Sequence, residues 1–191
     1  MCFSALSGNR QVTIVDQLHT DFLCILAVIP EDDLSMQNVA SENFRKSLLL
    51  SAASFFERRL VSILTELVNQ WSHSTLPLNE FVRIKAIERQ YHTYFDWDRP
   101  NGNPFFRLFG SDFKAFMERR CKDDEAFSDS VEAFIEIGRE RNRLVHQDFG
   151  SYALEKTFDE IYDLYKKARH FLDNLEQCFT DFNAQPTNEN D

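Results

Sequence analysis

Several features that would place this chain in a common class are missing from it. The longest apolar stretch is 22–29, far short of the roughly 20 residues that a membrane-spanning helix needs. The first residues lack the basic segment, apolar core and small-residue cleavage site of a signal peptide. We therefore expect a cytoplasmic protein that has no contact with a membrane.

Signatures of metal and nucleotide binding are missing as well. The four cysteines form no Cys-x-x-Cys pair and have no histidine at ligand spacing, which argues against a zinc site. The acidic run 123–125 lacks the ligand pattern of a calcium loop. No glycine-rich phosphate loop is present. We expect no metal and no cofactor, and we expect the acidic run to cap a helix.

Glycine and proline are scarce, at five each, which disfavours a turn-rich all-β fold. The 191 residues are 43% hydrophobic and include nineteen phenylalanines, enough for one domain with a substantial core. We predict a single helical domain over 1–182, followed by a disordered polar tail over 183–191.

Apolar residues recur at steps of three and four along most of the chain, which is typical of amphipathic helices. The segment 96–110 has a loop composition with clustered aromatic residues, which we expect to be pinned to the body. Four long helices, with shorter ones between the second and third, predict an all-α up-and-down four-helix bundle. The predicted helices cover 12–29, 39–71, 79–92, 111–121 (capped by Ser111), 124–149 and 158–179.

Charge is distributed unevenly. The net charge is −10, which excludes a protein that coats nucleic acid through general phosphate neutralisation. Residues 139–146, by contrast, hold three arginines against one glutamate, a formal charge of +2. We expect this local positive spot to end a helix, with Gly150 terminating it.

Within this spot, Arg141, Asn142 and His146 resemble the Arg-x(4–6)-His motif of the HEPN (higher eukaryotes and prokaryotes nucleotide-binding) superfamily. The segment 48–57 resembles the second core helix of bacterial HEPN families, and so does the aromatic segment 103–110, which is similar to the RiboL-PSP-like branch. The resemblance extends over about residues 8–182 and implies an α-helical bundle.

The resemblance also implies an activity. Members with this motif are typically metal-independent endoribonucleases, in which an RNA 2′-hydroxyl attacks the adjacent phosphate to leave a 2′,3′-cyclic phosphate and a 5′-hydroxyl. His146 would be the general base or acid. Arg141 would stabilise the charge that develops on the phosphate, and Asn142 would orient the histidine or the phosphate. Such an enzyme would be a toxin or a stress or phage-defence effector, with a possible antitoxin or other regulatory partner.

Helical geometry constrains this interpretation. Residues five apart on a regular helix point about 140° from each other, so Arg141 and His146 do not share a face. Asn142 lies one turn before His146, so these two residues share a face. Arg139 and Arg143 lie near that face, and we predict that they bind RNA. A homodimer with a composite active site would resolve the conflict, and the resemblance also implies a dimer.

Structural interpretations of the same residues stay open. The three arginines have acidic neighbours with which to form ion pairs, and His146 would be favourable as a cation at a helix end. Glu57 is either a supporting residue that orients the active-site arginine or a surface salt-bridge partner. The aromatic residues of 91–97 are either core or a stacking platform for bases. An alternative function is a non-catalytic HEPN module that binds a partner protein or a nucleotide.

Overall fold

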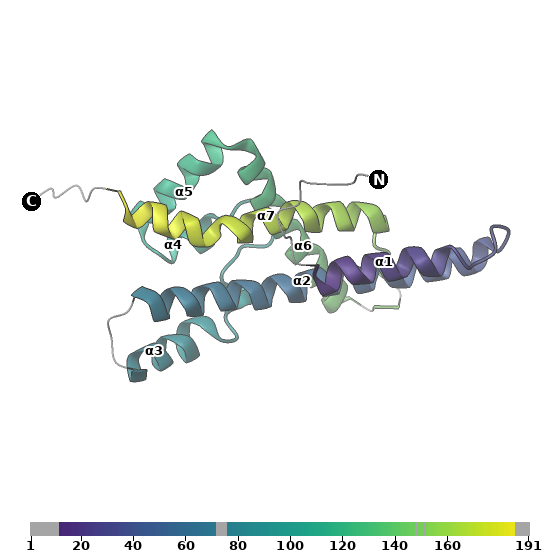
Figure 1. Ribbon diagram of the computed structural model, residues 1–191, viewed down its shortest axis with the longest axis horizontal. Helices are drawn as coiled ribbons and strands as arrows, with labels where there is room; N and C mark the ends of the chain where they lie inside the picture. The colour runs from purple at the N-terminus through teal and green to yellow at the C-terminus, as the bar shows by residue number, and fades with distance from the viewer. Residues whose placement is uncertain (1–11, 72–75, 148, 151, 186–191) are drawn as a thin grey trace, which may run out of the picture.

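The computed structural model describes residues 12–71, 76–147, 149–150 and 152–185, and within these ranges it contains helices and no strand. This confirms the predicted all-α class. The elements in chain order are α1 (Ile14–Leu26), α2 (Leu34–Trp71), α3 (Leu76–Val82), the π-helical turn η1 (Arg83–Ile87), the 3₁₀ turn η2 (Tyr91–Thr93), α4 (Asn103–Arg107), α5 (Ser111–Asp123), α6 (Glu125–His146) and α7 (Phe158–Asn183) (Figure 1).

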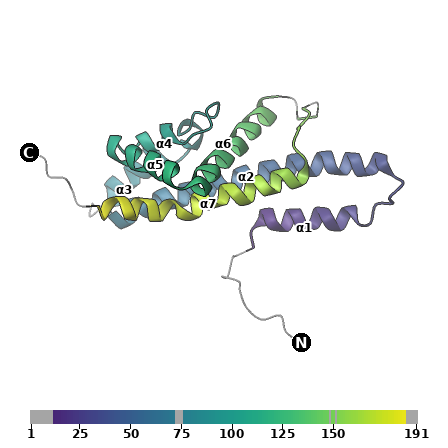
Figure 2. The ribbon, with the colours of Figure 1, turned by 90° about the horizontal axis from the view of Figure 1, so that it is seen from above.

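Four long helices form the body of the molecule. Figures 1 and 2 show α1 and α6 running in one direction and α2 and α7 in the other, with α6 packed along α7. The short elements from α3 to α5 all lie between α2 and α6 in the chain. This is the predicted up-and-down bundle with extra helices after the second core helix. None of the described helices has the length and hydrophobicity that crossing a membrane would require.

Side chains at the helix starts explain several boundaries. The Asp124 carboxylate accepts a hydrogen bond from Phe127 N at 3.0 Å, which confirms that the acidic run caps a helix. The predicted capping role of Ser111 is wrong: the residue before α5 is Gly110, whose φ of 101° permits the sharp turn out of α4. Helix α7 includes Asn183, the first residue of the predicted tail; residues 186–191 lie outside the described ranges, so the disordered tail stays a prediction.

The helix predicted over 79–92 is wrong in its second half. The helical path widens into the π-turn η1, ends at Ile87, and is followed by Arg89 with a φ of 61°. An extra residue in a helical turn breaks the three-and-four spacing. Ile87 and Tyr91 are therefore buried, whereas Phe81 and Ile84 are exposed.

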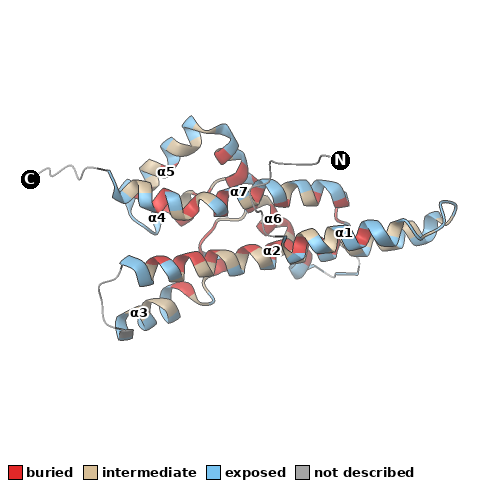
Figure 3. Ribbon diagram, viewed as in Figure 1, coloured by how far each residue is buried: buried red, intermediate tan, exposed pale blue. Residues whose placement is uncertain are grey.

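The core is aromatic, as the phenylalanine count predicts. Figure 3 shows the buried residues on the inner sides of the four long helices. Phe105 and Phe106 of α4 are fully buried, so the aromatic segment 96–110 is pinned to the body as expected. At the far end of the bundle, the rings of Phe113 and Phe179 stack at a centroid distance of 4.4 Å.

One carboxylate fastens α1 to α7. Asp16 accepts hydrogen bonds from the Thr13 backbone N–H at 2.8 Å and from the Tyr162 hydroxyl at 2.9 Å. Arg169 on α7 lies 3.7 Å from the same carboxylate. Partial burial alone would raise the pKa of Asp16, but these hydrogen bonds and the arginine together lower it below its usual value of 3.8.

We expect Asp16→Asn to lower the free energy of unfolding by about 1–2 kcal/mol at pH 7, because the charge-assisted hydrogen bonds are lost. A carboxylate with a lowered folded-state pKa stabilises above its unfolded pKa and loses that effect as the pH falls through the folded value. Urea denaturation should therefore show the difference between wild type and variant shrinking below about pH 3.8. Asp21→Asn, at an exposed position of α1, is the control, and a difference that persists at pH 2 would contradict this account.

Candidate functional site

Helix α6 ends at His146, one turn before the expected end at Phe149, so Gly150 does not terminate it. Gln147 is already extended, with φ −101° and ψ 166°, and its N–H bonds to the carbonyl of Arg143. A tertiary contact accounts for this early end of the helix. The chain after α6 packs against α2, where Lys46 Nζ donates a hydrogen bond to the Phe149 carbonyl at 2.8 Å.

Asn142 and His146 lie one helical turn apart and open onto the same cleft, which has a volume of about 480 Å³. The rest of the lining comes from α6 and its end and from the loop before α4. It consists of Arg139, Arg143, Gln147, Phe95, Asp96, Trp97 and Asp98. His146 is exposed, and its side chain makes no hydrogen bond, ion pair or ring contact with any residue that the structure describes. Its imidazole is therefore accessible to a ligand from solvent.

Arg141 is outside the lining of this cleft. It is half-buried, and its Nη1 donates to Asn142 Oδ1 at 3.1 Å. The motif is thus connected through the asparagine, which contacts Arg141 and lines the cleft that contains His146.

Glu57 on α2 is half-buried near the same residues. Burial raises the pKa of the Tyr91 hydroxyl; the charge of Glu57 raises it further, and the charge of Arg141 opposes this. Glu57 and Arg141 therefore both lie within electrostatic reach of one phenol. No ion pair within 4.0 Å joins the two in the described part of the chain.

Arg139 and Arg143 are held by acidic neighbours, as in the ion-pair interpretation. Glu140 is buried, and its Oε1 lies 3.0 Å from Arg143 Nη1 and 3.6 Å from Arg139 Nε. The Tyr152 hydroxyl donates to the other oxygen of Glu140 at 3.1 Å. Asp148, a further candidate partner, is outside the described residues. The local positive charge is therefore partly neutralised within this one chain.

The loop residues that line the cleft pack against α6 at a glycine. The indole ring of Trp97 packs against α6 at Gly138, where a Cβ would overlap the ring. The indole Nε1 also donates to the His92 carbonyl at 3.0 Å. Phe95 is buried and Trp97 is partly buried against the core, as in the core interpretation. Both also line the cleft, and their stacking on bases stays a prediction.

Sequence reasoning missed Lys46, which is only 2% exposed. Besides the Phe149 carbonyl, its ammonium contacts Glu42 at 3.0 Å and lies 5.2 Å from the centroid of the Phe149 ring. A signal was present, because Lys46 lies three and seven residues before the buried Leu49 and Ala53. A lysine at a core-facing position needs a buried partner.

No group of three or more His, Cys, Asp or Glu side chains is placed to hold a metal ion in the described ranges. The functional groups at the cleft are an accessible imidazole, an amide and nearby guanidinium groups.

We expect Gly138→Ala to destabilise the protein by about 1–3 kcal/mol through overpacking, although the same change in an open helix would stabilise it by about 1 kcal/mol. Thermal denaturation measures the effect. The double variant Gly138→Ala/Trp97→Ala is the control. Adding Gly138→Ala to Trp97→Ala should be neutral or stabilising, and an equal loss in both backgrounds would show that Trp97 is not the obstacle.

We expect Lys46→Met to cost about 1–3 kcal/mol, because the Phe149 carbonyl loses its buried donor. Hydrogen exchange should also quicken at the amides just after α6. Glu42→Gln is the matched control: that carboxylate is half-exposed, so its loss should destabilise the protein clearly less than the loss of Lys46. Equal effects of the two changes would assign the stabilisation to the ion pair and contradict this prediction.

Comparison with known proteins places this chain in a family. The family model described as RiboL-PSP-HEPN matches residues 25–181, from the end of α1 into the last turn of α7. No curated protein and no solved structure matches. The matched region includes all of α6 and the residues that line the cleft. The chain therefore belongs to the RiboL-PSP branch of the HEPN superfamily.

Proposed function

We propose that this protein is an endoribonuclease whose active site includes the end of α6. The observation that carries the proposal is that Asn142 and His146 open onto one cleft while Asn142 also bonds to Arg141. An accessible imidazole is suited to proton transfer near neutral pH. A guanidinium is suited to a phosphate, to which it donates planar hydrogen bonds.

The proposed reaction needs no metal. The 2′-oxygen of the RNA forms a bond to the adjacent phosphorus while the bond from phosphorus to the 5′-oxygen breaks. The 2′-hydroxyl gives up a proton and the departing 5′-oxygen gains one. His146 serves one of these transfers, Arg141 stabilises the added charge on the phosphate, and Asn142 orients them. The required 2′-hydroxyl restricts the substrate to RNA.

The active form that we propose is a homodimer. In one chain Arg141 lies outside the cleft that His146 enters, and a single imidazole cannot readily be base and acid at once. A second helix end facing the first would supply the missing arginine and a second histidine. Arg139 and Arg143 would bind RNA by giving up their contacts with Glu140 and pairing with phosphate groups of the RNA instead.

The setting that we propose is cytoplasmic. One domain over residues 1–182 would act as a toxin or as a stress or phage-defence effector, held in check by an antitoxin or another regulatory protein. This part of the proposal is supported by the HEPN family alone.

A second candidate, a non-catalytic module that binds a protein or a nucleotide, is favoured by the charges around the cleft. Asp96 and Asp98 line it, Glu140 neutralises its arginines, and the whole chain carries −10. Such a surface attracts RNA weakly.

Incubation of the purified protein with RNA in EDTA tests the proposal. We expect cleavage that leaves cyclic phosphate ends, and a loss of about 100-fold or more in His146→Ala and Arg141→Ala. His170→Ala, at an exposed helical histidine on α7, is the matched control and should retain activity. Unchanged cleavage in His146→Ala would refute the mechanism, and no cleavage of any RNA would favour the binding module.

Mixing two inactive variants tests the composite site. A heterodimer of Arg141→Ala and His146→Ala chains contains one site with an intact arginine from one chain and an intact histidine from the other. We expect activity to return in part on mixing, because this one site holds the arginine and one of the two histidines. If the mixture is no more active than each variant alone while the wild type cleaves, the composite site is refuted.

A further inference from the structure

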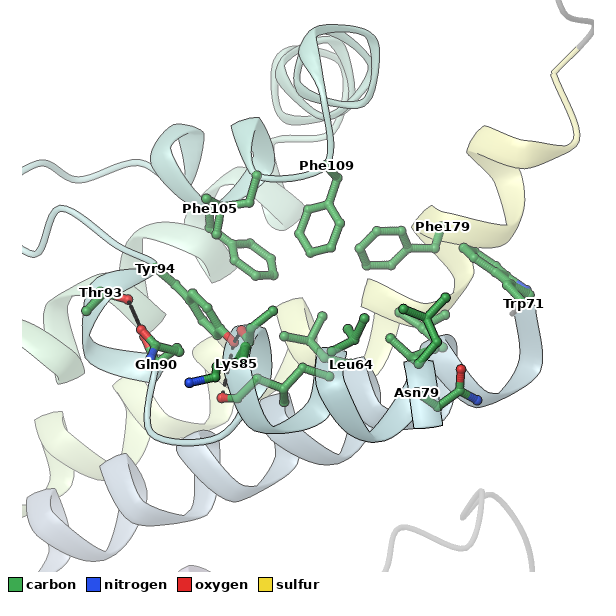
Figure 4. A pocket seen from close by; sticks show the side chains of 17 residues that line it. Leu64, Trp71, Asn79, Lys85, Gln90, Thr93, Tyr94, Phe105, Phe109 and Phe179 are labelled. Atoms are coloured by element: carbon green, nitrogen blue, oxygen red, sulfur yellow. Dashed lines mark hydrogen bonds between the residues drawn. The ribbon is translucent and has the colours of Figure 1, made fainter. Parts of the chain in front are cut away.

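A second cavity lies at the opposite end of the bundle from His146. Its volume is about 680 Å³, within the range of about 300–1,000 Å³ that is usual for sites that hold a small molecule. Four parts of the chain surround it (Figure 4): the last third of α2, the segment from α3 to η2 and Tyr94, the α4 region, and the end of α7.

The lining of this cavity is apolar, with aromatic rings on one side. Figure 4 shows Phe105, Phe109 and Phe179 facing Leu64 across the space, with Trp71 at one end. Aliphatic side chains of α2 and α3 complete the apolar part: Leu67, Val68, Leu78 and Val82. A ligand that fills the cavity must therefore present mostly carbon.

Charge in the cavity is of one sign. The chain contains 31 aspartates and glutamates, yet none of those in the described ranges lines this space. Among the described residues, the one charged side chain in the lining is Lys85, which is exposed and forms no ion pair within 4.0 Å. In a protein of net charge −10, a carboxylate-free cavity with a lysine at its edge is a local site for an anion.

The turn η1 sets this lysine in place. Its π-helical geometry puts three consecutive residues, Lys85 to Ile87, on the cavity wall. The Tyr94 hydroxyl donates to the carbonyls of Ala86 and Ile87, at 2.5 and 3.2 Å. Burial raises the pKa of Tyr94 to about 12, so the phenol stays a hydrogen-bond donor at neutral pH. Tyr94 is thus occupied by the wall itself, and Lys85 is left to meet a ligand.

We propose that this cavity binds a small amphipathic anion, with an apolar body among the aromatic and aliphatic side chains and one acidic group at Lys85. A nucleotide or RNA would bury several charges and polar base edges against carbon, which costs free energy without compensating hydrogen bonds. A cation would be repelled by Lys85. This site shares no residue with the cleft of His146, so the inference does not depend on ribonuclease activity.

The two tryptophans make the test specific, because Trp71 lines this cavity and Trp97 lines the other cleft. We would titrate full-length Trp97→Phe protein, in which Trp71 alone emits, with dodecanoate below its critical micelle concentration. We expect a saturable change in Trp71 emission, and no change in the Trp71→Phe protein, in which Trp97 alone emits. Dodecyltrimethylammonium, of the same chain length and opposite charge, should bind at least about ten-fold more weakly.

Two variants and a control locate the ligand. Lys85→Met should weaken dodecanoate binding about ten-fold, whereas Lys122→Met, at an exposed lysine on α5, should leave it unchanged. Val68→Phe should abolish binding by filling the cavity, with circular dichroism and thermal denaturation verifying that the variant is folded.

Three results would overturn the proposal: no saturable change at Trp71, equal affinity for the two surfactants, or equal affinity of wild type and Lys85→Met. A Trp71 signal that depends on protein concentration without any added probe would instead assign the cavity to contact between two copies of the chain.

Discussion

The ring of Phe134 joins the bundle and the candidate site into one body. It lies on α6 and contacts Phe56 of α2 at a centroid distance of 5.6 Å, Phe171 of α7 at 5.3 Å and Phe95 of the loop before α4 at 5.1 Å. Aromatic pairs at such distances stabilise beyond the area that they bury. Because α6 is fixed through this ring on three sides, its end is presented in a defined orientation although the last residues are exposed.

The end of α6, unlike the apolar core, contains a buried charge with compensating partners. Glu140 is buried next to two arginines and a tyrosine hydroxyl, so its charge is compensated and theirs is partly neutralised. A buried carboxylate without such partners would carry a large desolvation cost. The same contacts hold the arginines close to the helix. A phosphate that enters the cleft must therefore compete with Glu140 for these guanidinium groups.

The spacing of apolar residues predicted the helices well, because it reflects which face of each helix is buried. The last helix and the aromatic segment around Phe105 are examples. Prediction failed where a distant contact outweighs local preference. The chain just after α6 is held by Lys46, which lies 103 residues before Phe149. The last carbonyls of the π-turn η1 accept hydrogen bonds from the Tyr94 hydroxyl, a contact that no periodicity encodes.

The candidate site was predictable to the same extent. Helical spacing placed Asn142 with His146 and apart from Arg141, which is the arrangement around the cleft. It did not predict that the loop bearing Asp96 and Trp97 forms the opposite wall, because that depends on Trp97 packing at Gly138. The catalytic and RNA-binding roles of these residues stay predictions.

Helix α2 has 38 residues and so measures about 57 Å at 1.5 Å per residue. Lys46 near its beginning holds the chain after His146, Glu57 near its middle lies close to Tyr91, and Leu64 and Trp71 at its end line the apolar cavity. Helix α2 therefore contacts both the chain after α6 and the apolar cavity. A rotation of α2 about its axis would displace one wall of the cavity and Lys46 together.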